Sequence, residues 1–141
     1  MIDKLIKKII DMQNPTCVGL DTQLGYLPEE MRAGVSSFGQ AADAILAFNK
    51  KIVDSVCDIV PAVKVQIAYY EQYGAAGVQA FLDTVAYARG KGLFVIADCK
   101  RNDIGSTAAR YSAAYLGETA LGDAKVMEAG CDFLTVDAYL G

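Results

Sequence analysis

Asp98, Lys100 and Asp103 stand at a spacing that suits acid–base chemistry. They follow Leu93–Ala97, an apolar run rich in β-branched residues, which is typical of a strand buried on both faces. Because side chains alternate along a strand, we expect Asp98 and Lys100 to project to the same side at its carboxyl end. Neighbouring carboxylates favour the charged form of a lysine. Such a fixed cation can stabilise a developing carbanion and then donate a proton to it.

A purely structural interpretation of these residues is also open. Asp98 and Lys100 can form a salt bridge at the end of a strand, and Asp103 can cap a helix that begins after it. Asp21 and Lys64 end two other predicted strands, and can likewise be a cap and a lysine that reaches into solvent. The arrangement of the predicted strands and helices helps to decide between a catalytic and a purely structural role.

The hydrophobic pattern predicts strands that alternate with helices. Pro61 restricts regular pairing in the second strand to the residues after it. The pattern shows no hairpin, so we expect βαβ units and a parallel sheet. The expected strands are 16–20, 60–65, 93–97 and 133–136; the expected helices are 2–12, 40–57, 78–89, 106–115 and 119–129, with a loop at 22–30 and a helical turn at 69–74.

Every predicted strand ends in an ionisable residue. These residues are Asp21, Lys64, Asp98 and Asp137, at intervals of 43, 34 and 39 residues. Catalytic residues collect at the carboxyl ends of the strands in a (β/α)8 TIM barrel, so the pattern predicts this α/β fold. A doubly wound sheet is disfavoured because no glycine-rich phosphate turn follows the first strand. A whole barrel needs about 250 residues. We therefore expect residues 1–141 to supply an amino-terminal helix and the first four β/α units, as the amino-terminal half of one barrel domain.

The composition argues against several classes of protein. A net charge of −4 gives no basic excess for binding nucleic acid. No apolar run approaches the roughly 18 residues that span a bilayer, so we expect a soluble cytoplasmic protein with no membrane partner. The absence of histidine excludes Ser-His and Cys-His catalysis by these residues. The four cysteines lack C-x-x-C spacing, which predicts reduced thiols and no zinc site.

Four motifs together resemble the orotidine monophosphate decarboxylase family, in its longer bacterial subgroup. The resemblance extends along the whole chain. It implies a (β/α)8 barrel homodimer that converts orotidine 5'-phosphate, a nucleotide, to UMP and carbon dioxide in pyrimidine biosynthesis, without a metal or an organic cofactor. The motifs are Val18-Gly19-Leu20-Asp21, Pro61-Ala62-Val63-Lys64, Asp98-Cys99-Lys100-Arg101-Asn102-Asp103-Ile104-Gly105-Ser106-Thr107 and Tyr139-Leu140-Gly141.

The resemblance also implies a catalytic array of alternating charges. The residues that match it are Lys64, Asp98, Lys100 and Asp103. In this array Lys100 is the proton donor. Asp103 is expected to enter the site of the partner subunit, so that each site is shared across the dimer.

Four residues match the family's substrate contacts. Asp21 and Lys64 match residues that bind the ribose, and Ile104 and Thr107 match residues that flank the site across the dimer. Asp137 stands where family members often carry asparagine or serine. No pyrimidine contact is assigned to it.

Two other functions remain open at this stage. Keto-gulonate phosphate decarboxylases and hexulose phosphate synthases share the barrel and the D-x-K-x-x-D pattern, but they bind magnesium to stabilise an enediolate. In those relatives Ala-Gly follows the last aspartate, whereas Ile104-Gly105-Ser106-Thr107 follows it here. The second alternative is a half-barrel fragment without activity.

Overall fold

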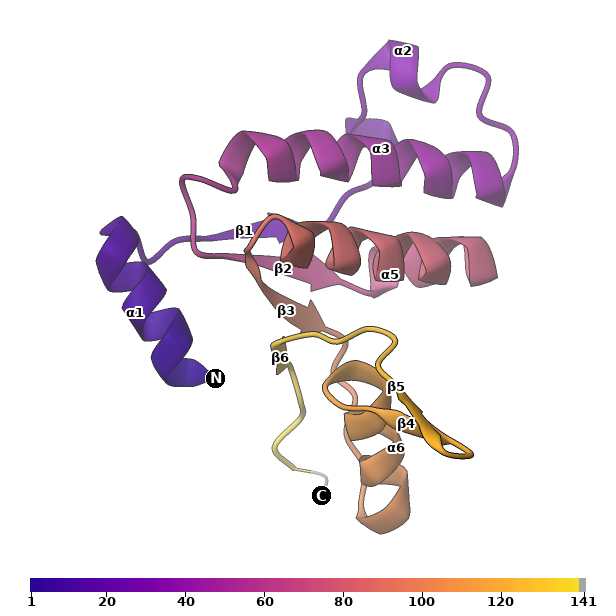
Figure 1. Ribbon diagram of the computed structural model, residues 1–141. Helices are drawn as coiled ribbons and strands as arrows, with labels where there is room; N and C mark the ends of the chain where they lie inside the picture. The colour runs from indigo at the N-terminus through magenta and orange to yellow at the C-terminus, as the bar shows by residue number, and fades with distance from the viewer. Residues whose placement is uncertain (140–141) are drawn as a thin grey trace.

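A parallel sheet of four strands forms the centre of the molecule (Figure 1). The computed structural model describes residues 1–139, and Leu140 and Gly141 of the predicted Tyr139-Leu140-Gly141 motif lie outside that range. The four predicted strands and their parallel pairing are confirmed. Regular pairing of the second strand begins directly after Pro61, which has no amide hydrogen to donate to a neighbour. In spatial order the strands are β1 (Cys17–Leu20), β2 (Ala62–Gln66), β3 (Phe94–Asp98) and β6 (Phe133–Leu134).

Two long helices lie side by side over one face of this sheet (Figure 1). They are α3 (Phe38–Val56), which Ser37 caps by accepting a hydrogen bond from the amide of Gln40, and α5 (Gly74–Gly90). The segment expected to be a loop at 22–30 contains two short helical turns. The remaining helices are α1 (Ile2–Met12), the 3-10 helix η1 (Leu24–Tyr26), α2 (Glu29–Arg32), α4 (Ala68–Glu71) and α6 (Gly105–Tyr115).

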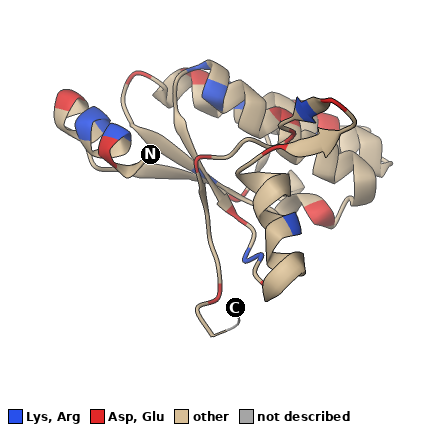
Figure 2. Cartoon of the chain, turned by 60° about the horizontal axis from the view of Figure 1, so that its bottom comes forward, with Lys and Arg blue, Asp and Glu red and all other residues tan. Residues whose placement is uncertain are grey.

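The amino-terminal helix α1 lies at the amino-terminal ends of the strands. The ammonium group of Lys8 donates a hydrogen bond of 2.6 Å to the carbonyl of Gly92, just before β3. After the helix, the side-chain amide of Asn14 donates to the carbonyl of Ile59, just before β2. Figure 2 shows acidic and basic residues interspersed along the polar side of α1. The predicted amphipathic helix at 2–12 is therefore confirmed.

The predicted helix at 119–129 is wrong, and so is the expectation that the chain holds no hairpin. Antiparallel strands β4 (Thr119–Leu121) and β5 (Ala124–Val126) form a hairpin there. Gly122, at the turn, has a φ of 61°, which a right-handed helix cannot accommodate, and a Gly-Asp pair between two short strands is a hairpin signal. Both strands are exposed, so no packing against the core favours a helix at this place.

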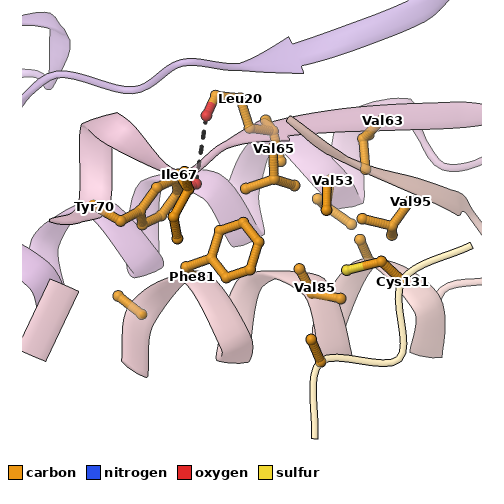
Figure 3. Packing of buried hydrophobic residues seen from close by; sticks show 14 of the residues in the cluster. Leu20, Val53, Val63, Val65, Ile67, Tyr70, Phe81, Val85, Val95 and Cys131 are labelled. Atoms are coloured by element: carbon orange, nitrogen blue, oxygen red, sulfur yellow. Dashed lines mark hydrogen bonds between the residues drawn. The ribbon is translucent and has the colours of Figure 1, made fainter. Parts of the chain in front are cut away.

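The two faces of the sheet have opposite character. Val63, Val65 and Val95 face the helices and are fully buried, together with Phe81 of α5 (Figure 3). Residues in register across the sheet share a face. On the opposite face, Lys64 and Gln66 of β2 and Phe94, Ile96 and Asp98 of β3 are only half-buried.

The order of the strands favours a barrel over a doubly wound sheet. Each strand is added beside its predecessor, β1-β2-β3-β6, without the reversal that defines a doubly wound sheet. The two long helices also share one face. The sheet is therefore an arc of a (β/α) barrel, with helices outside and the half-buried face inside.

We predict that Gly77→Ala destabilises the fold by about 3 kcal/mol. A Cβ atom built on Gly77 of α5 would stand 1.8 Å from the carbonyl oxygen of Tyr70. Relief therefore requires α4 and α5 to move apart. Urea unfolding of the two chains measures the difference. Gly39→Ala in α3 is the matched control, because no atom outside its chain neighbours and the adjacent backbone of its own helix lies within 4 Å of its Cβ position. Equal unfolding free energies for both variants would contradict this packing.

Candidate active site

Lys64 links the carboxyl ends of three neighbouring strands. Its ammonium nitrogen lies 2.8 Å from Oδ1 of Asp21, beyond β1, and 3.2 Å from Oδ2 of Asp98, at the end of β3. The pairing register places Lys64 between Gly19 and Ile96 on the inner face of the sheet. Gly19 contributes no side chain that would separate Lys64 from Asp21. The structure thus brings together residues that lie 43 and 34 positions apart in the chain.

Asp98 is the centre of the site. Its Oδ1 accepts hydrogen bonds from the ammonium of Lys100 at 2.6 Å and the hydroxyl of Thr135 at 2.9 Å. Its Oδ2 accepts from Lys64 at 3.2 Å and from the side-chain amide of Gln66 at 2.8 Å. The side chain of Asp98 is 13% exposed, whereas that of Lys100 is 63% exposed. Lys100 is therefore anchored to the largely buried carboxylate of Asp98, while most of its own side chain stays exposed to solvent.

The ionisation of Asp98 and Lys64 follows from these contacts. Partial burial acts to raise the pKa of Asp98, but hydrogen bonds from Lys100, Thr135 and Lys64 outweigh it and lower the pKa to about 2. Partial burial acts to lower the pKa of Lys64, yet its bonds to Asp21 and Asp98 raise the pKa above its ordinary value. Both groups are thus charged at neutral pH.

Lys100 has a left-handed backbone conformation, with a φ of 50°. This conformation costs a residue with a side chain roughly 1–2 kcal/mol, so neighbouring contacts must hold it. The amide of Lys100 donates to the hydroxyl of Thr135 at 3.1 Å. On its other side, Arg101 donates to the carbonyl of Cys99 and pairs with Glu71 after β2. These contacts hold the turn that aims Lys100.

Asp103 lies outside this cluster. Its Oδ1 accepts a hydrogen bond of 2.7 Å from the amide of Ile104 at the start of α6. Within residues 1–139, no hydrogen bond or ion pair joins Asp103 to a lysine. Ile104 and Thr107 are exposed on the first turn of α6. Of the predicted site residues, the structure therefore groups Asp21, Lys64, Asp98 and Lys100, and it separates Asp103, Ile104 and Thr107 from them.

A cleft of about 600 Å³ opens beside the charged cluster. Its lining residues come from the ends of β3 and β6, and they are Asp98, Lys100, Asn102, Thr135, Val136 and Asp137. The amide of Asp137 donates to the side chain of Asn102, which ties the two strand-end loops together. Asp103 lines an adjoining cavity of about 250 Å³ beside α6, and Asn102, Val136 and Asp137 line both the cavity and the cleft.

Sequence reasoning missed two members of the site. Gln66 and Thr135 both donate to Asp98. Each lies on the inner face of its strand, Gln66 two residues after Lys64 and Thr135 two residues after Phe133. Strand parity could have found them, but neutral side chains at a strand end are too common to identify a site without the register.

The remaining sequence predictions concern metals, cysteines and membranes. Among residues 1–139 no group of three or more His, Cys, Asp or Glu side chains is arranged to hold a metal ion. All four cysteines are free thiols. Burial raises the pKa of Cys99 to about 11 and that of Cys131 to about 12, so both are structural, unreactive thiols. Over the same range, the structure has no helix with the length and hydrophobicity needed to cross a membrane.

Comparison with known proteins finds longer chains of similar sequence. An orotidine 5'-phosphate decarboxylase of Clostridium perfringens (strain SM101 / Type A) is 42% identical over 139 residues, which cover 99% of this chain and 44% of that protein. One from Clostridium acetobutylicum is 41% identical over 141 residues and 45% of its length. The crystal structure of Plasmodium berghei orotidine 5'-monophosphate decarboxylase is 17% identical. It matches the fold with a TM-score of 0.76, over 97% of this chain and 52% of that one.

The fold and the site together define a class of protein: an α/β chain that forms part of a (β/α) barrel, with a charged cluster at the carboxyl ends of its strands. Residues 15–141 match the orotidine 5'-phosphate decarboxylase / HUMPS family, and the chain belongs to that family. It spans less than half the length of the curated relatives named above.

The low pKa of Asp98 predicts how stability depends on pH. Its folded-state pKa of about 2 lies below the unfolded value of 3.8. The stabilisation is therefore complete above about pH 5 and is lost as the pH falls through 2, by up to about 2 kcal/mol. Urea unfolding between pH 5 and pH 2 should show a weaker dependence in Asp98→Asn than in the wild type. Asp43→Asn, an exposed position on α3, should keep the wild-type slope; a wild-type slope in Asp98→Asn would refute the assignment.

Proposed function

We propose that this chain supplies the amino-terminal half of an orotidine 5'-phosphate decarboxylase barrel, which converts orotidine 5'-phosphate to UMP and carbon dioxide. The observation that carries the proposal is the cluster of Asp21, Lys64, Asp98 and Lys100 at the carboxyl ends of three adjacent parallel strands. Relatives about 42% identical carry this name. Residues 1–141 form one half of a single domain in this proposal, and the remaining strands complete it.

The reaction requires a cation beside the reacting carbon. When the bond to the carboxylate breaks, its electron pair stays on the pyrimidine carbon as carbon dioxide leaves. Lys100 is held 2.6 Å from Asp98 and reaches into the cleft beside it, so its ammonium can stabilise that electron pair. The ammonium then donates a proton to the carbon, which gives UMP, and Lys100 regains a proton from solvent.

The rest of the site binds and encloses the nucleotide. Asp21 and Lys64 contact the ribose in this proposal. Asp103, Ile104 and Thr107 lie at the start of α6, away from the charged cluster of their own subunit. In a homodimer these three residues serve the site of the partner. The enzyme works in the cytoplasm, where pyrimidine synthesis supplies its substrate.

The hydrogen bonds of Asp98 favour this reaction over magnesium-dependent chemistry. Both carboxylate oxygens accept two hydrogen bonds each, from Lys100 and Thr135 on one side and from Lys64 and Gln66 on the other. A magnesium ion would have to displace one of these donors from the carboxylate and would then lie beside at least one lysine ammonium. We therefore propose that the site requires no metal or organic cofactor.

The central test uses a chimaera in which residues 1–141 replace the matched part of the Clostridium perfringens relative. We predict turnover of orotidine 5'-phosphate by this protein, followed by absorbance. Lys100→Ala should reduce kcat by at least about 10³-fold, since the loss of a transition-state charge costs several kcal/mol. UMP binding should remain within a few-fold of the parent.

Two controls make this test specific. Lys51→Ala on α3 removes a lysine outside the site and should leave turnover unchanged. Exhaustive chelation should also leave turnover intact. Loss of turnover in chelator with recovery in magnesium would favour the enediolate-forming relatives, and a folded chimaera without turnover would contradict the decarboxylase itself.

The shared site predicts complementation between two inactive variants. Lys100→Ala damages the site of its own subunit, and Asp103→Ala damages the site of its partner. A mixed dimer therefore places both lesions in one site and leaves the other intact. Random exchange makes about half of the dimers mixed, so about a quarter of the parental activity should return on mixing.

Subunit exchange must be verified by native mass spectrometry. Mixing two preparations of Lys100→Ala alone is the matched control and should restore nothing. If exchange is complete and activity stays at the level of the parents, Asp103 does not act across a dimer.

A further inference from the structure

A buried polar network lies directly behind Asp21. The hydroxyl of Thr22 donates to Oδ1 of Asn49 at 2.6 Å, and the side-chain amide of Asn49 donates to the hydroxyl of Tyr70 at 2.8 Å. The Tyr70 hydroxyl in turn donates to the carbonyl of Leu20 at 3.4 Å (Figure 3). Tyr70 and Asn49 are fully buried and Thr22 is 4% exposed. The network therefore begins and ends on the two residues that flank Asp21.

The network joins three elements at one end of the barrel. Leu20 is the last residue of β1 and Thr22 lies two residues beyond it. Asn49 belongs to the middle of α3, and Tyr70 to α4, which follows β2. Leu20 and Thr22 face the helices, whereas Asp21 faces the inner surface and accepts a hydrogen bond from Lys64 of β2. The same two strand ends are thus tied together on both sides, by an ion pair inside and by the network outside.

An apolar core would stabilise this position at least as well. Buried polar groups lose their hydrogen bonds to water, and a typical internal bond returns only about 1 kcal/mol, so their benefit is geometric rather than energetic. Every buried side-chain polar atom of residues 1–139 has a hydrogen-bond partner. Burial also raises the pKa of Tyr70, and hydrogen bonds with Thr84 and Asn49 lower it only in part. The hydroxyl therefore keeps its proton and remains a donor. A fully satisfied network of this kind permits one arrangement of its members.

We propose that Thr22, Asn49 and Tyr70 are positioning residues, which fix the end of β1 so that the carboxylate of Asp21 stays on the ammonium of Lys64. This inference rests on the proposed function only for its effect on turnover. The position of Asp21 on Lys64 does not depend on that function. Loss of one hydrogen bond from the network lets the segment around Asp21 move, and Lys64 then keeps only Asp98 as a carboxylate partner.

The first measurement needs no activity. In the 141-residue chain labelled with 15N-lysine, the ammonium of Lys64 is followed by NMR through the exchange of its protons with water, and Lys64→Arg assigns the signal. Thr22→Val and Tyr70→Phe remove one hydroxyl each and should speed the exchange. Thr22→Ser keeps the hydroxyl and should restore the wild-type rate.

Val53→Ala is the matched control for lost stability. It lies on the same helix as Asn49, one turn further on, and it is 1% exposed without belonging to the network. It should destabilise the chain and leave the exchange of the Lys64 ammonium unchanged. If Thr22→Val and Tyr70→Phe behave like Val53→Ala, the network is only a part of the core and the proposal is overturned.

The second measurement uses the chimaera with the Clostridium perfringens relative. Tyr70→Phe should lower kcat/KM about 10- to 100-fold, as is usual when the support of a site residue is removed. On an Asp21→Asn background the same substitution should have less than about a twofold effect, because its target is already lost. Full additivity of the two substitutions would overturn the proposal.

The two measurements separate this inference from the decarboxylase function. Faster exchange of the Lys64 ammonium in Thr22→Val and Tyr70→Phe supports the positioning role even if the parent chimaera has no turnover. In that case only the proposed function fails.

Discussion

The site depends on the hydrogen bonds and ion pairs that the carboxylate of Asp98 forms. This carboxylate accepts four hydrogen bonds, from two residues of β2 and from one residue after each of β3 and β6, and Lys64 extends the connection to Asp21 beyond β1. A carboxylate at 13% exposure has lost much of its hydration, so its charge requires compensation from the protein. Two lysines supply that compensation, and in return the carboxylate determines where their ammonium groups lie. The position of each strand end is thus coupled to the others through one anion.

The division of the sheet into two faces makes this arrangement possible. Aliphatic side chains of one parity bury themselves against α3 and α5, and this packing determines how the strands lie. The other parity is left for polar residues at the carboxyl ends. Parallel strands bring those ends to one edge, so residues far apart in sequence meet without long loops. The buried network of Thr22, Asn49 and Tyr70 reaches the same edge from the helical side.

The turn after β3 explains why three charges in one short motif do not form one cluster. Lys100 takes a left-handed conformation that returns its side chain to Asp98. Arg101 is held against Cys99 and Glu71, and the chain then turns away toward α6, where Asp103 contacts the amide of Ile104. The motif therefore divides its charges between two places. This division is the basis of the shared site proposed above.

Local patterns identified the strands, most helices and the charged residues at the strand ends. They failed at 119–129, where the composition is typical of a helix. The positive φ of Gly122 permits a hairpin there, and the exposed segment has no packing against the core that would favour a helix. The sequence also identified the motif around Asp98, Lys100 and Asp103, but it did not predict that Asp103 lies apart from the other two residues.

The partners of each side chain depended on how the strands pack together. Side-chain parity is a property of each strand alone, so Asp21, Lys64 and Asp98 were predictable as inward-facing residues. The register between strands brings Thr135 and Gln66 to the carboxylate of Asp98, and no local pattern specifies it. The contact of Asn49 with Tyr70 likewise depends on how α3 and α4 pack against β1. The direction of a side chain follows from the short-range geometry of its own strand. Which side chains of different strands meet follows from how the strands pack to bury their shared apolar face.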